Sequence, residues 1–335
     1  MPLITWGFIF IVSLALLIKG ADWLVESSEK IGRALKISPF IIGVTIVALG
    51  TSLPELASSL AAVFKDATEI VAANVIGSNI ANILLIVGLS ALATKSFLAV
   101  RRSLIDIDLP LLAAVTVLFG FILWDGKITR LEGLLLLLAF LVYLLYTFFQ
   151  RGAELERPLP EELPTGEISE VLPSRVDRRR PKKPVEKLNF KVFFFLILGA
   201  AFLAIGANYL IDSVLKLAEI LEIGVSIIAI FGVAVGTSLP ELVVSVRAAA
   251  QKKYEIALGN IFGSNVFNAL VVIGIPSLIK PLLVDSITFQ IGFPFMVVAT
   301  ILLVISGITR RISIWEGAMF LLIYLLFLAK LFGWF

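Results

Sequence analysis

The stretch GVTIVALGTSLPEL, from Gly43 to Leu56, begins as apolar sequence and then places a proline and a carboxylate in its middle. Its heptad GTSLPEL, Gly50 to Leu56, recurs as Gly236 to Leu242, again inside an apolar run. Because Pro54 has no N–H, the carbonyl of Gly50 loses its helical partner, and we predict a break in the helix there. Irregular backbone and an ionisable side chain at membrane depth are both costly, so the heptad indicates a functional site.

The composition places the whole chain in the membrane class. Of its 335 residues, 59% are hydrophobic and 16% are charged, whereas about a quarter are charged in soluble domains. Apolar runs of about 20 residues, enough to cross a bilayer, recur along nearly the whole chain. The chain has no cysteine and no histidine, which excludes disulfides, thiolate zinc sites and a Ser-His-Asp triad. The net charge of +3 is too small to suggest a nucleic acid partner.

Ten apolar segments predict ten transmembrane helices. They are 3–25, 39–64, 70–93, 104–124, 131–149, 190–214, 225–249, 256–279, 287–305 and 314–332. The segment 150–189 is rich in Pro, Glu and Arg, and this composition predicts a disordered linker. The chain is thereby divided into a first half, 1–149, the linker, and a second half, 190–335.

The two halves are repeats of one another. With an offset of 186, the two heptads coincide, and NVIGSNIAN (Asn74 to Asn82) falls on NIFGSNVFN (Asn260 to Asn268). Farther along each half, an offset of 184 aligns Glu132 with Glu316. Because five spans is an odd number, the second copy must insert upside down. The predicted fold is therefore an all-α membrane protein with ten transmembrane helices in two inverted five-helix repeats.

The distribution of basic residues predicts the orientation in the membrane. Twenty of the 28 Lys and Arg residues lie in the odd-numbered loops, including the linker, and six lie in the even-numbered loops and the C-terminal end. Basic loops stay in the cytoplasm. We therefore expect a multi-pass protein of the plasma membrane, with the linker 150–189 cytoplasmic and both termini outside.

The repeated motifs offer only oxygen ligands. Glu55 and Glu241 supply one carboxylate per half, and the adjacent Thr-Ser pairs add hydroxyl and carbonyl oxygens. In the second motif an asparagine, a serine and another asparagine, spaced i, i+4 and i+8, share one helix face in each half. Such oxygens suit hard cations, and calcium in particular accepts six to eight of them. Inverted pairs of broken helices bind ions at the repeat interface of transporters.

Each of these features, taken alone, has a simpler interpretation. A proline kink can serve packing, a lone glutamate can sit at the membrane interface, and a small-residue stripe can serve helix contact. For Asp22, Asp106, Asp108, Asp125 and Glu132, which lie near predicted span ends, an interfacial charge is the favoured interpretation. Joint recurrence of the heptad and the asparagine motif in both halves favours transport.

Two GTSLPEL heptads, each followed by GSNIAN or GSNVFN, resemble the alpha-repeats of the calcium/cation antiporter superfamily, and most closely those of prokaryotic sodium/calcium exchangers. The resemblance covers the whole chain except the linker. It implies ten helices, two inverted halves, and alternating access in which the first and sixth helices slide over a core. It also implies an antiporter that exchanges Na⁺ for Ca²⁺, uses no covalent step, needs no cofactor and functions as a monomer.

The resemblance also implies a set of ion ligands. Glu55 and Glu241 would be the central carboxylates, Thr51 and Thr237 would give main-chain oxygens, and Ser52 and Ser238 would give hydroxyls. The carbonyls of Ala48 and Ala234, with Ser78 and Ser264, would complete flanking sodium sites, and Asn82 and Asn268 would line the middle. Asn268 departs from the pattern, since many exchangers carry Asp there; an amide supplies no charge, so potassium co-transport is not expected.

Three alternatives remain open at this point. A proton/calcium exchanger could use the same site, because two glutamates can carry two protons as readily as one Ca²⁺. The Thr-Ser flanks favour sodium, since proton coupling needs no additional oxygens. An intramembrane enzyme is disfavoured by the missing His and Cys and by the lack of a paired-Asp motif. A passive channel would be distinguished by the absence of saturable, counter-ion-dependent flux.

Overall fold

The structure, a computed structural model, describes residues 2–35, 37–64, 66–94, 96–100, 108–154, 189–220 and 238–334. Within these residues nearly all regular structure is helical. The first half contains α1 (Pro2–Leu35), α2 (Pro39–Ile42), η1 (Gly43–Val47), α3 (Ala48–Phe64), α4 (Glu69–Ile80), η2 (Ala81–Ile86), α5 (Val87–Ala93), α6 (Leu109–Leu123) and α7 (Arg130–Glu154). The second half contains α8 (Phe190–Ile220), α10 (Leu239–Ala250), α11 (Tyr254–Phe267), η5 (Asn268–Val272), α12 (Ile273–Ile279), η6 (Thr288–Gly292), α13 (Phe293–Ile308) and α14 (Ile314–Leu331).

Eight helical segments in the described part of the chain are long and apolar enough to cross a membrane. The two predicted spans outside this set are 104–124, where the helix α6 is shorter, and 225–249, where the structure describes only α10 at its end. The helix α7 continues to Glu154, beyond the predicted span end at 149, and the rest of the predicted linker, 155–188, lies outside the described residues. The expectation of an all-helical membrane fold is confirmed.

Four very short strands were not predicted. They are β1 (Phe97–Ala99), β2 (Lys127–Ile128), β3 (Leu282–Leu283) and β4 (Arg311–Ser313). β1 pairs with β4, with Leu98 opposite Ile312, and β2 pairs with β3, with Ile128 opposite Leu282. Leu98 and Leu282 are equivalent in the 184-residue offset, and so are Ile128 and Ile312. The two sheets therefore join the halves at equivalent positions: a leucine of the first half pairs with an isoleucine of the second in one sheet, and the reverse holds in the other.

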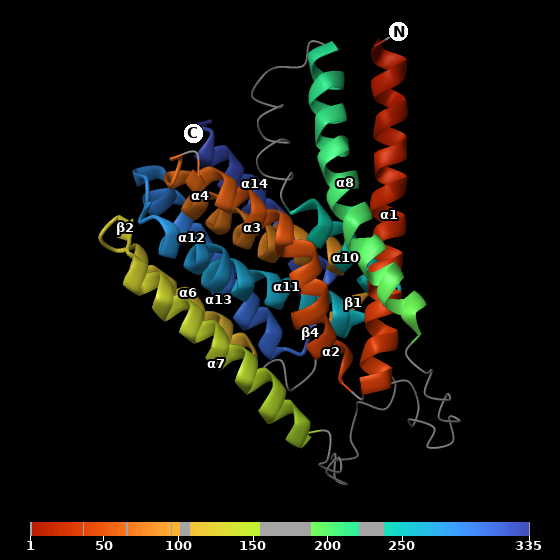
Figure 1. The fold of residues 1–335 in the computed structure, drawn as a ribbon, viewed down its shortest axis with the longest axis horizontal. Helices are drawn as coiled ribbons and strands as arrows, with labels where there is room; N and C mark the ends of the chain where they lie inside the picture. The colour runs from red at the N-terminus through yellow and green to blue at the C-terminus, as the bar shows by residue number, and fades with distance from the viewer. Residues whose placement is uncertain are drawn as a thin grey trace.

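The long helices α1 and α8 lie side by side and run antiparallel at one side of the bundle, where both also contact α10 (Figure 1). Their contact is close because small residues line it: a Cβ at Gly20 would lie 2.8 Å from the carbonyl oxygen of Gly199. One at Gly206 would lie 3.0 Å from the carbonyl oxygen of Ser13. Gly206 and Gly199 are the 186-offset equivalents of Gly20 and Ser13, so this contact too joins equivalent positions in exchanged pairs.

The core of the bundle is built around the segment from α11 to α12, which is almost entirely buried. In contrast, most of the apolar surface of α1 is not covered by protein, as expected for a helix that faces lipid. Gly263 lies where α11 crosses η1 and α3. A Cβ there would lie 2.4 Å from the carbonyl oxygen of Val44 and 2.6 Å from the Cβ of Ala48. The glycine in the second motif thus lets the two halves touch beside the repeated heptads.

The predicted helix break at Gly50 is wrong for the first half. Pro54 lies inside α3, which runs without interruption from Ala48 to Phe64. Proline removes one hydrogen bond, but its fixed φ is compatible with the helix, so α3 continues past it. In the second half the heptad behaves differently, because α10 starts at Leu239 with Pro240 in its first turn. Proline is favoured at that position, where the missing N–H has no helical partner to lose.

Candidate cation-binding site

Two glutamates, one from each half, are buried in the centre of the protein. Glu55 lies on α3, one turn after Ser52, and has 1% of its surface exposed. Glu241 lies in the first turn of α10 and is fully buried. The Ser52 hydroxyl, one turn before Glu55 on α3, contacts Glu241, so the two acids lie in one buried region. Two buried acids in one electrostatic environment repel each other when ionised, so the arrangement favours a bound cation.

Ser52 joins the two halves at this point. Its hydroxyl donates to Oε1 of Glu241 at 2.7 Å, across 189 residues of sequence. The hydroxyl of Ser264, on α11, lies 2.9 Å from that of Ser52 and 3.5 Å from the same carboxylate oxygen. Three of the predicted site residues therefore meet around one carboxylate, and they come from three different helices.

Several buried oxygens of the site have no protein hydrogen-bond partner among the described residues. These atoms are Oε1 and Oε2 of Glu55, Oε2 of Glu241, Oγ of Ser238, Oδ1 of Asn82 and Oδ1 of Asn268. Buried polar atoms are nearly always satisfied, and a buried carboxylate without a partner is especially unfavourable. All of them are acceptors or hydroxyls, so they are chemically suited to coordinate a metal cation. The absence of three or more clustered His, Cys, Asp or Glu residues in the described chain is compatible with this, since the remaining ligands are neutral oxygens.

Thr51 contacts a residue outside the predicted set. Its hydroxyl lies 3.2 Å from the carbonyl oxygen of Ala48 and 3.1 Å from Oδ1 of Asn260, and its one proton is shared between these two acceptors. Asn260 in turn donates from Nδ2 to Ser245 at 2.9 Å and lies 3.5 Å from the carbonyl oxygen of Glu241. Sequence reasoning placed Asn260 on the same helix face as Ser264 but assigned it no role.

A second contact missed from the sequence joins the asparagine motifs. Asn79 donates from Nδ2 to the carbonyl of Asn265 at 3.1 Å, and Asn268 donates to Oδ1 of Asn79 at 3.3 Å. Asn79 and Asn265 occupy the same position of the GSN motif, so this shared asparagine was a signal that could have identified them. Asn268 is also the first residue of the π-helical turn η5, and irregular turns of this type are common at functional sites.

The predicted site residues that the structure describes are all buried: Ala48, Thr51, Ser52, Glu55, Ser78, Asn82, Ser238, Glu241, Ser264 and Asn268. The structure brings Ser52, Glu241 and Ser264 into direct contact. Ala234 and Thr237 lie outside the described residues.

The acidic residues near helix ends have partners of their own. Asp22 on α1 accepts hydrogen bonds from two guanidinium nitrogens of Arg247, at 2.9 and 3.1 Å. Glu132 accepts the N–H and the hydroxyl of Thr129 at the start of α7, while the Glu132 N–H donates back to that hydroxyl at 3.3 Å, which forms a capping box. These contacts explain both residues through helix packing and helix capping.

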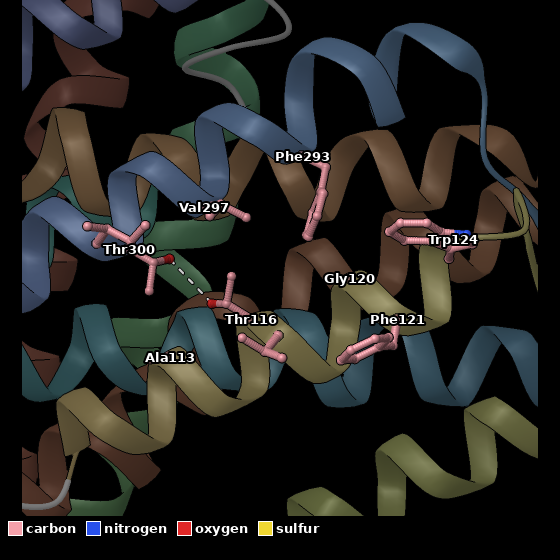
Figure 2. Close-up of a pocket in the computed structure, with 10 residues that line it drawn as sticks. Ala113, Thr116, Gly120, Phe121, Trp124, Phe293, Val297 and Thr300 are labelled. Carbon is pink, nitrogen blue, oxygen red and sulfur yellow. Dashed lines mark hydrogen bonds between the residues drawn. The ribbon is translucent and has the colours of Figure 1, made fainter.

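A separate hollow of about 300 Å³ lies between α6 and α13 (Figure 2). Its lining is mostly apolar and aromatic, and includes Phe121, Trp124 and Phe293. Thr116 and Thr300, which are equivalent in the two halves, bond to each other at 3.3 Å at its edge. None of the described residues that line it is acidic, so they offer no charge to a cation.

Similarity to known proteins agrees with this geometry. Residues 5–149 and 191–333 match the family described as sodium/calcium exchanger protein. The sodium/calcium exchanger MaX1 of Methanosarcina acetivorans is 34% identical over 353 aligned positions, which cover 98% of this chain and 99% of the relative. The inner membrane protein YrbG of Escherichia coli is 32% identical over 88% of this chain and 86% of its own.

The fold is also similar to a solved structure. The sodium-calcium exchanger NCX_Mj, in crystals soaked with zero Na⁺ and Ca²⁺, matches with a TM-score of 0.78 and 31% identity. The match covers 98% of this chain and 99% of that one. The resemblance carried by the heptads is confirmed, and the two sodium/calcium exchangers MaX1 and NCX_Mj are transporters and not enzymes. This chain belongs to the sodium/calcium exchanger protein family.

Proposed function

We propose that the protein is a secondary antiporter that exchanges Na⁺ for Ca²⁺ across the membrane by alternating access. The observation that carries the proposal is the pair of buried carboxylates, Glu55 and Glu241, with the Ser52 hydroxyl of the first half bound to the carboxylate of the second. Three of their four oxygens have no protein partner in the described part of the chain. Two carboxylates carry a formal charge of −2, which one Ca²⁺ neutralises, whereas Mg²⁺ sheds its water reluctantly and suits the site less.

In this proposal each half contributes an equivalent set of ligands. The carboxylates hold calcium and sodium in competition, so that binding one ion displaces the other. The neutral ligands are the carbonyls of Ala48, Thr51, Ala234 and Thr237, the hydroxyls of Ser52, Ser78, Ser238 and Ser264, and the amides of Asn82 and Asn268. The burial of all the described members and the contact of Ser52 and Ser264 with Glu241 support this assignment.

Alternating access requires the two halves to be inverted copies that bring the site to either face in turn. Support comes from contacts that occur twice with the halves interchanged: a position of the first half touches one of the second, and their equivalents touch in the same way. Such contacts occur between α1 and α8 and in both small sheets. Exchanged pairs of this kind are what a two-fold relation between two units produces. Equivalent helices α1 and α8 run antiparallel, as inversion demands (Figure 1). We propose that these two helices slide together over the rest of the bundle.

The basic residues support an orientation for this inverted arrangement. The excess of Lys and Arg in the odd-numbered loops supports a plasma-membrane protein with the segment 150–189 in the cytoplasm and both termini outside. Because both carboxylates come from one chain, the proposed site is complete within a monomer.

The deciding experiment is calcium uptake into proteoliposomes that contain the purified protein. Vesicles preloaded with Na⁺ should accumulate Ca²⁺, and vesicles with only a pH gradient should not. Uptake driven by the pH gradient alone would instead support proton/calcium exchange. Flux without saturation or counter-ion dependence would support a channel.

Variants of the carboxylates test the site itself. Glu55→Gln and Glu241→Gln should each abolish exchange while the protein elutes as a folded species. Glu132→Gln is the matched control, because Glu132 caps α7 and lies outside the proposed ligands. Full exchange in either of the first two variants would refute the assignment of the ligands.

A further inference from the structure

Each half of the protein carries an asparagine and a serine in equivalent places beside the carboxylates. In the second half these are Asn260 on α11 and Ser245 on α10, and in the first half they are Asn74 on α4 and Ser59 on α3. The offset of 186 relates Ser59 to Ser245 and Asn74 to Asn260. None of the four belongs to the ligand set proposed above.

The two pairs differ in their hydrogen bonding. Asn260 Nδ2 donates to the Ser245 hydroxyl at 2.9 Å, and Asn260 Oδ1 accepts from the Thr51 hydroxyl at 3.1 Å. In the first half, Asn74 Nδ2 and Ser59 Oγ are both buried and have no partner among the described residues, so their equivalent bond is not formed. The Asn–Ser hydrogen bond is therefore present in the second repeat and absent from the equivalent place in the first.

The same difference appears at the carboxylates. Ser52 of the first half binds Glu241 of the second, but the equivalent Ser238 hydroxyl and both oxygens of Glu55 have no partner in the described chain. A buried donor without a partner is unfavourable by an amount comparable to a whole hydrogen bond. A pair that is hydrogen-bonded in one repeat and unpaired in the equivalent place of the other therefore points to a second arrangement in which it is satisfied.

We propose that Asn260 and Asn74 are positioning residues that hold the ion-binding segments alternately. In the state described here, Asn260 is fixed by Ser245 and fixes Thr51, whose carbonyl is a proposed ligand. In the opposite state Asn74 is hydrogen-bonded to Ser59 and fixes the equivalent ion-binding segment of the second half, while the Asn260–Ser245 hydrogen bond is broken. The inference rests on the proposed function, and it assigns to each asparagine one of the two faces of the membrane.

The geometry explains why Asn260 suits this purpose. Its side chain is fully buried and touches α3 of one half together with α10 of the other. An amide can donate and accept at once, so it links Thr51 to Ser245 without carrying a charge into the membrane. A leucine of similar size would fill the space but would leave both hydroxyls without this partner.

The experiment measures the apparent calcium affinity at each membrane face, in right-side-out and everted vesicles. The matched variants are Ser245→Ala and Ser59→Ala, which remove one equivalent hydroxyl each. We expect Ser245→Ala to raise the half-saturating calcium concentration about tenfold at one face, and Ser59→Ala to do so at the opposite face. Ser245→Thr, which keeps a hydroxyl, should restore most of the affinity.

Two results would overturn the inference: equal effects of both variants at the same face, or no effect of either. A general structural defect would weaken binding at both faces and would not be rescued by threonine. Should Ser245→Ala fail to fold, Thr51→Val removes the second hydroxyl held by Asn260 and should weaken the same face. Absence of sodium-dependent uptake in the unmodified protein would refute the proposed function. Normal uptake, with no variant changing the calcium affinity at one face more than at the other, would refute only the role given to the two asparagines.

Discussion

At the scale of the residue, the most informative feature is a single hydroxyl. Ser52 precedes Glu55 by three positions in the first half, but its hydroxyl donates a hydrogen bond to Glu241 of the second. A hydroxyl that both accepts and donates can bind the neighbouring Ser264 at the same time. The Glu241 carboxylate is thus held by a residue of the opposite half, which makes the site sensitive to any movement between the halves.

Ser52→Ala should destabilise the ion-free protein by about 1–2 kcal/mol, because it leaves Glu241 with one less buried hydrogen bond. Its matched control is Ser238→Ala, the equivalent position, whose hydroxyl has no partner in the described chain. The measurement is thermal unfolding in detergent without sodium or calcium. Equal losses in both variants would contradict the hydrogen bonding described here.

At the scale of the element, close helix contacts depend on glycine. A Cβ at Gly263 would come within 2.4 Å of the Val44 carbonyl oxygen, a distance that real Cβ atoms do not adopt, so α11 and η1 would have to separate. Backbone atoms cannot yield as a flexible side chain can. The position of α11 relative to α3, and with it the Ser264–Ser52 contact, therefore depends on this residue.

Gly263→Ala should reduce sodium-dependent calcium uptake at least about tenfold, because overpacking at such a contact is unfavourable by about 1–3 kcal/mol and displaces proposed ligands. Gly7→Ala on α1 is the control, since a Cβ there would have nothing within 4 Å. Normal uptake in Gly263→Ala would show that the helices can separate without disturbing the site.

A second element-scale prediction concerns the turn before η6. Asp285 accepts the Thr288 N–H at 2.9 Å and the Thr288 hydroxyl at 2.6 Å. Burial raises the pKa of Asp285, but these hydrogen bonds outweigh it, so the pKa lies below its ordinary value. The stabilisation is therefore present above the ordinary pKa of the carboxyl, and it is lost as the pH falls through the lowered one.

Asp285→Ala should lower the free energy of unfolding by about 1 kcal/mol at neutral pH, as for the loss of a helix cap. Asp285→Asn keeps an acceptor for the Thr288 N–H and should lose less. The difference in the free energy of unfolding between Asp285→Ala and the unmodified protein should shrink at acidic pH, below about 4. A constant difference across this range in thermal unfolding experiments would contradict the assignment.

At the scale of the whole molecule, the two halves differ in charge where α1 meets α10. Asp22 binds Arg247, and Glu29 binds Lys253 at 2.8 Å, so one ion pair ties α1 to the last turn of α10 and another to the residue that precedes α11. The equivalent positions in the opposite half are Asn208, Ala61, Leu215 and Ala67, which cannot form ion pairs. If α1 and α8 slide in the proposed cycle, these pairs stabilise the state described here and have no equivalent in the opposite one.

Neutralising Asp22 and Glu29 together, as Asn and Gln, should shift the balance away from this state. Each partly exposed pair contributes up to about 1 kcal/mol, so the population ratio should change by at most about thirtyfold. The chain has no native cysteine, so spin labels placed at Ile4 on α1 and Trp315 on α14, both well exposed, report their separation without interference.

The control for this measurement is Asp125→Asn, which removes an acidic residue that accepts the N–H of Lys127, two positions along the chain. A growing second distance population in the double variant, and in the unmodified protein at high salt, is the expected result. An unchanged distance distribution would mean that the ion pairs do not bias the position of α1.

The sequence by itself determined the membrane class, most of the spans, the repeat and the burial of both glutamates. Hydropathy and internal similarity are properties of the chain read in one dimension, and they need no knowledge of which segment lies beside which. The resemblance to the exchanger family added Ser52 and Ser264 as expected ligands, and the structure places both beside Glu241. It was wrong about the helix at Gly50, because proline weakens a helix locally while the surrounding bundle decides whether it continues.

Only the tertiary structure decided which residues meet. Ser52 binds the carboxylate of the opposite half, Thr51 is held by Asn260, and Asp22 pairs with Arg247, each across about 190 residues or more. The two heptads are identical in sequence, yet Gly50–Leu56 lies within a continuous helix, whereas Ser238 precedes a helix that begins at Leu239. The equivalent serines Ser52 and Ser238 differ in the described chain because their neighbours differ: Ser52 contacts Glu241 and Ser264, whereas the Ser238 hydroxyl has no described partner. Contacts between distant segments determine hydrogen bonding that local preference leaves open.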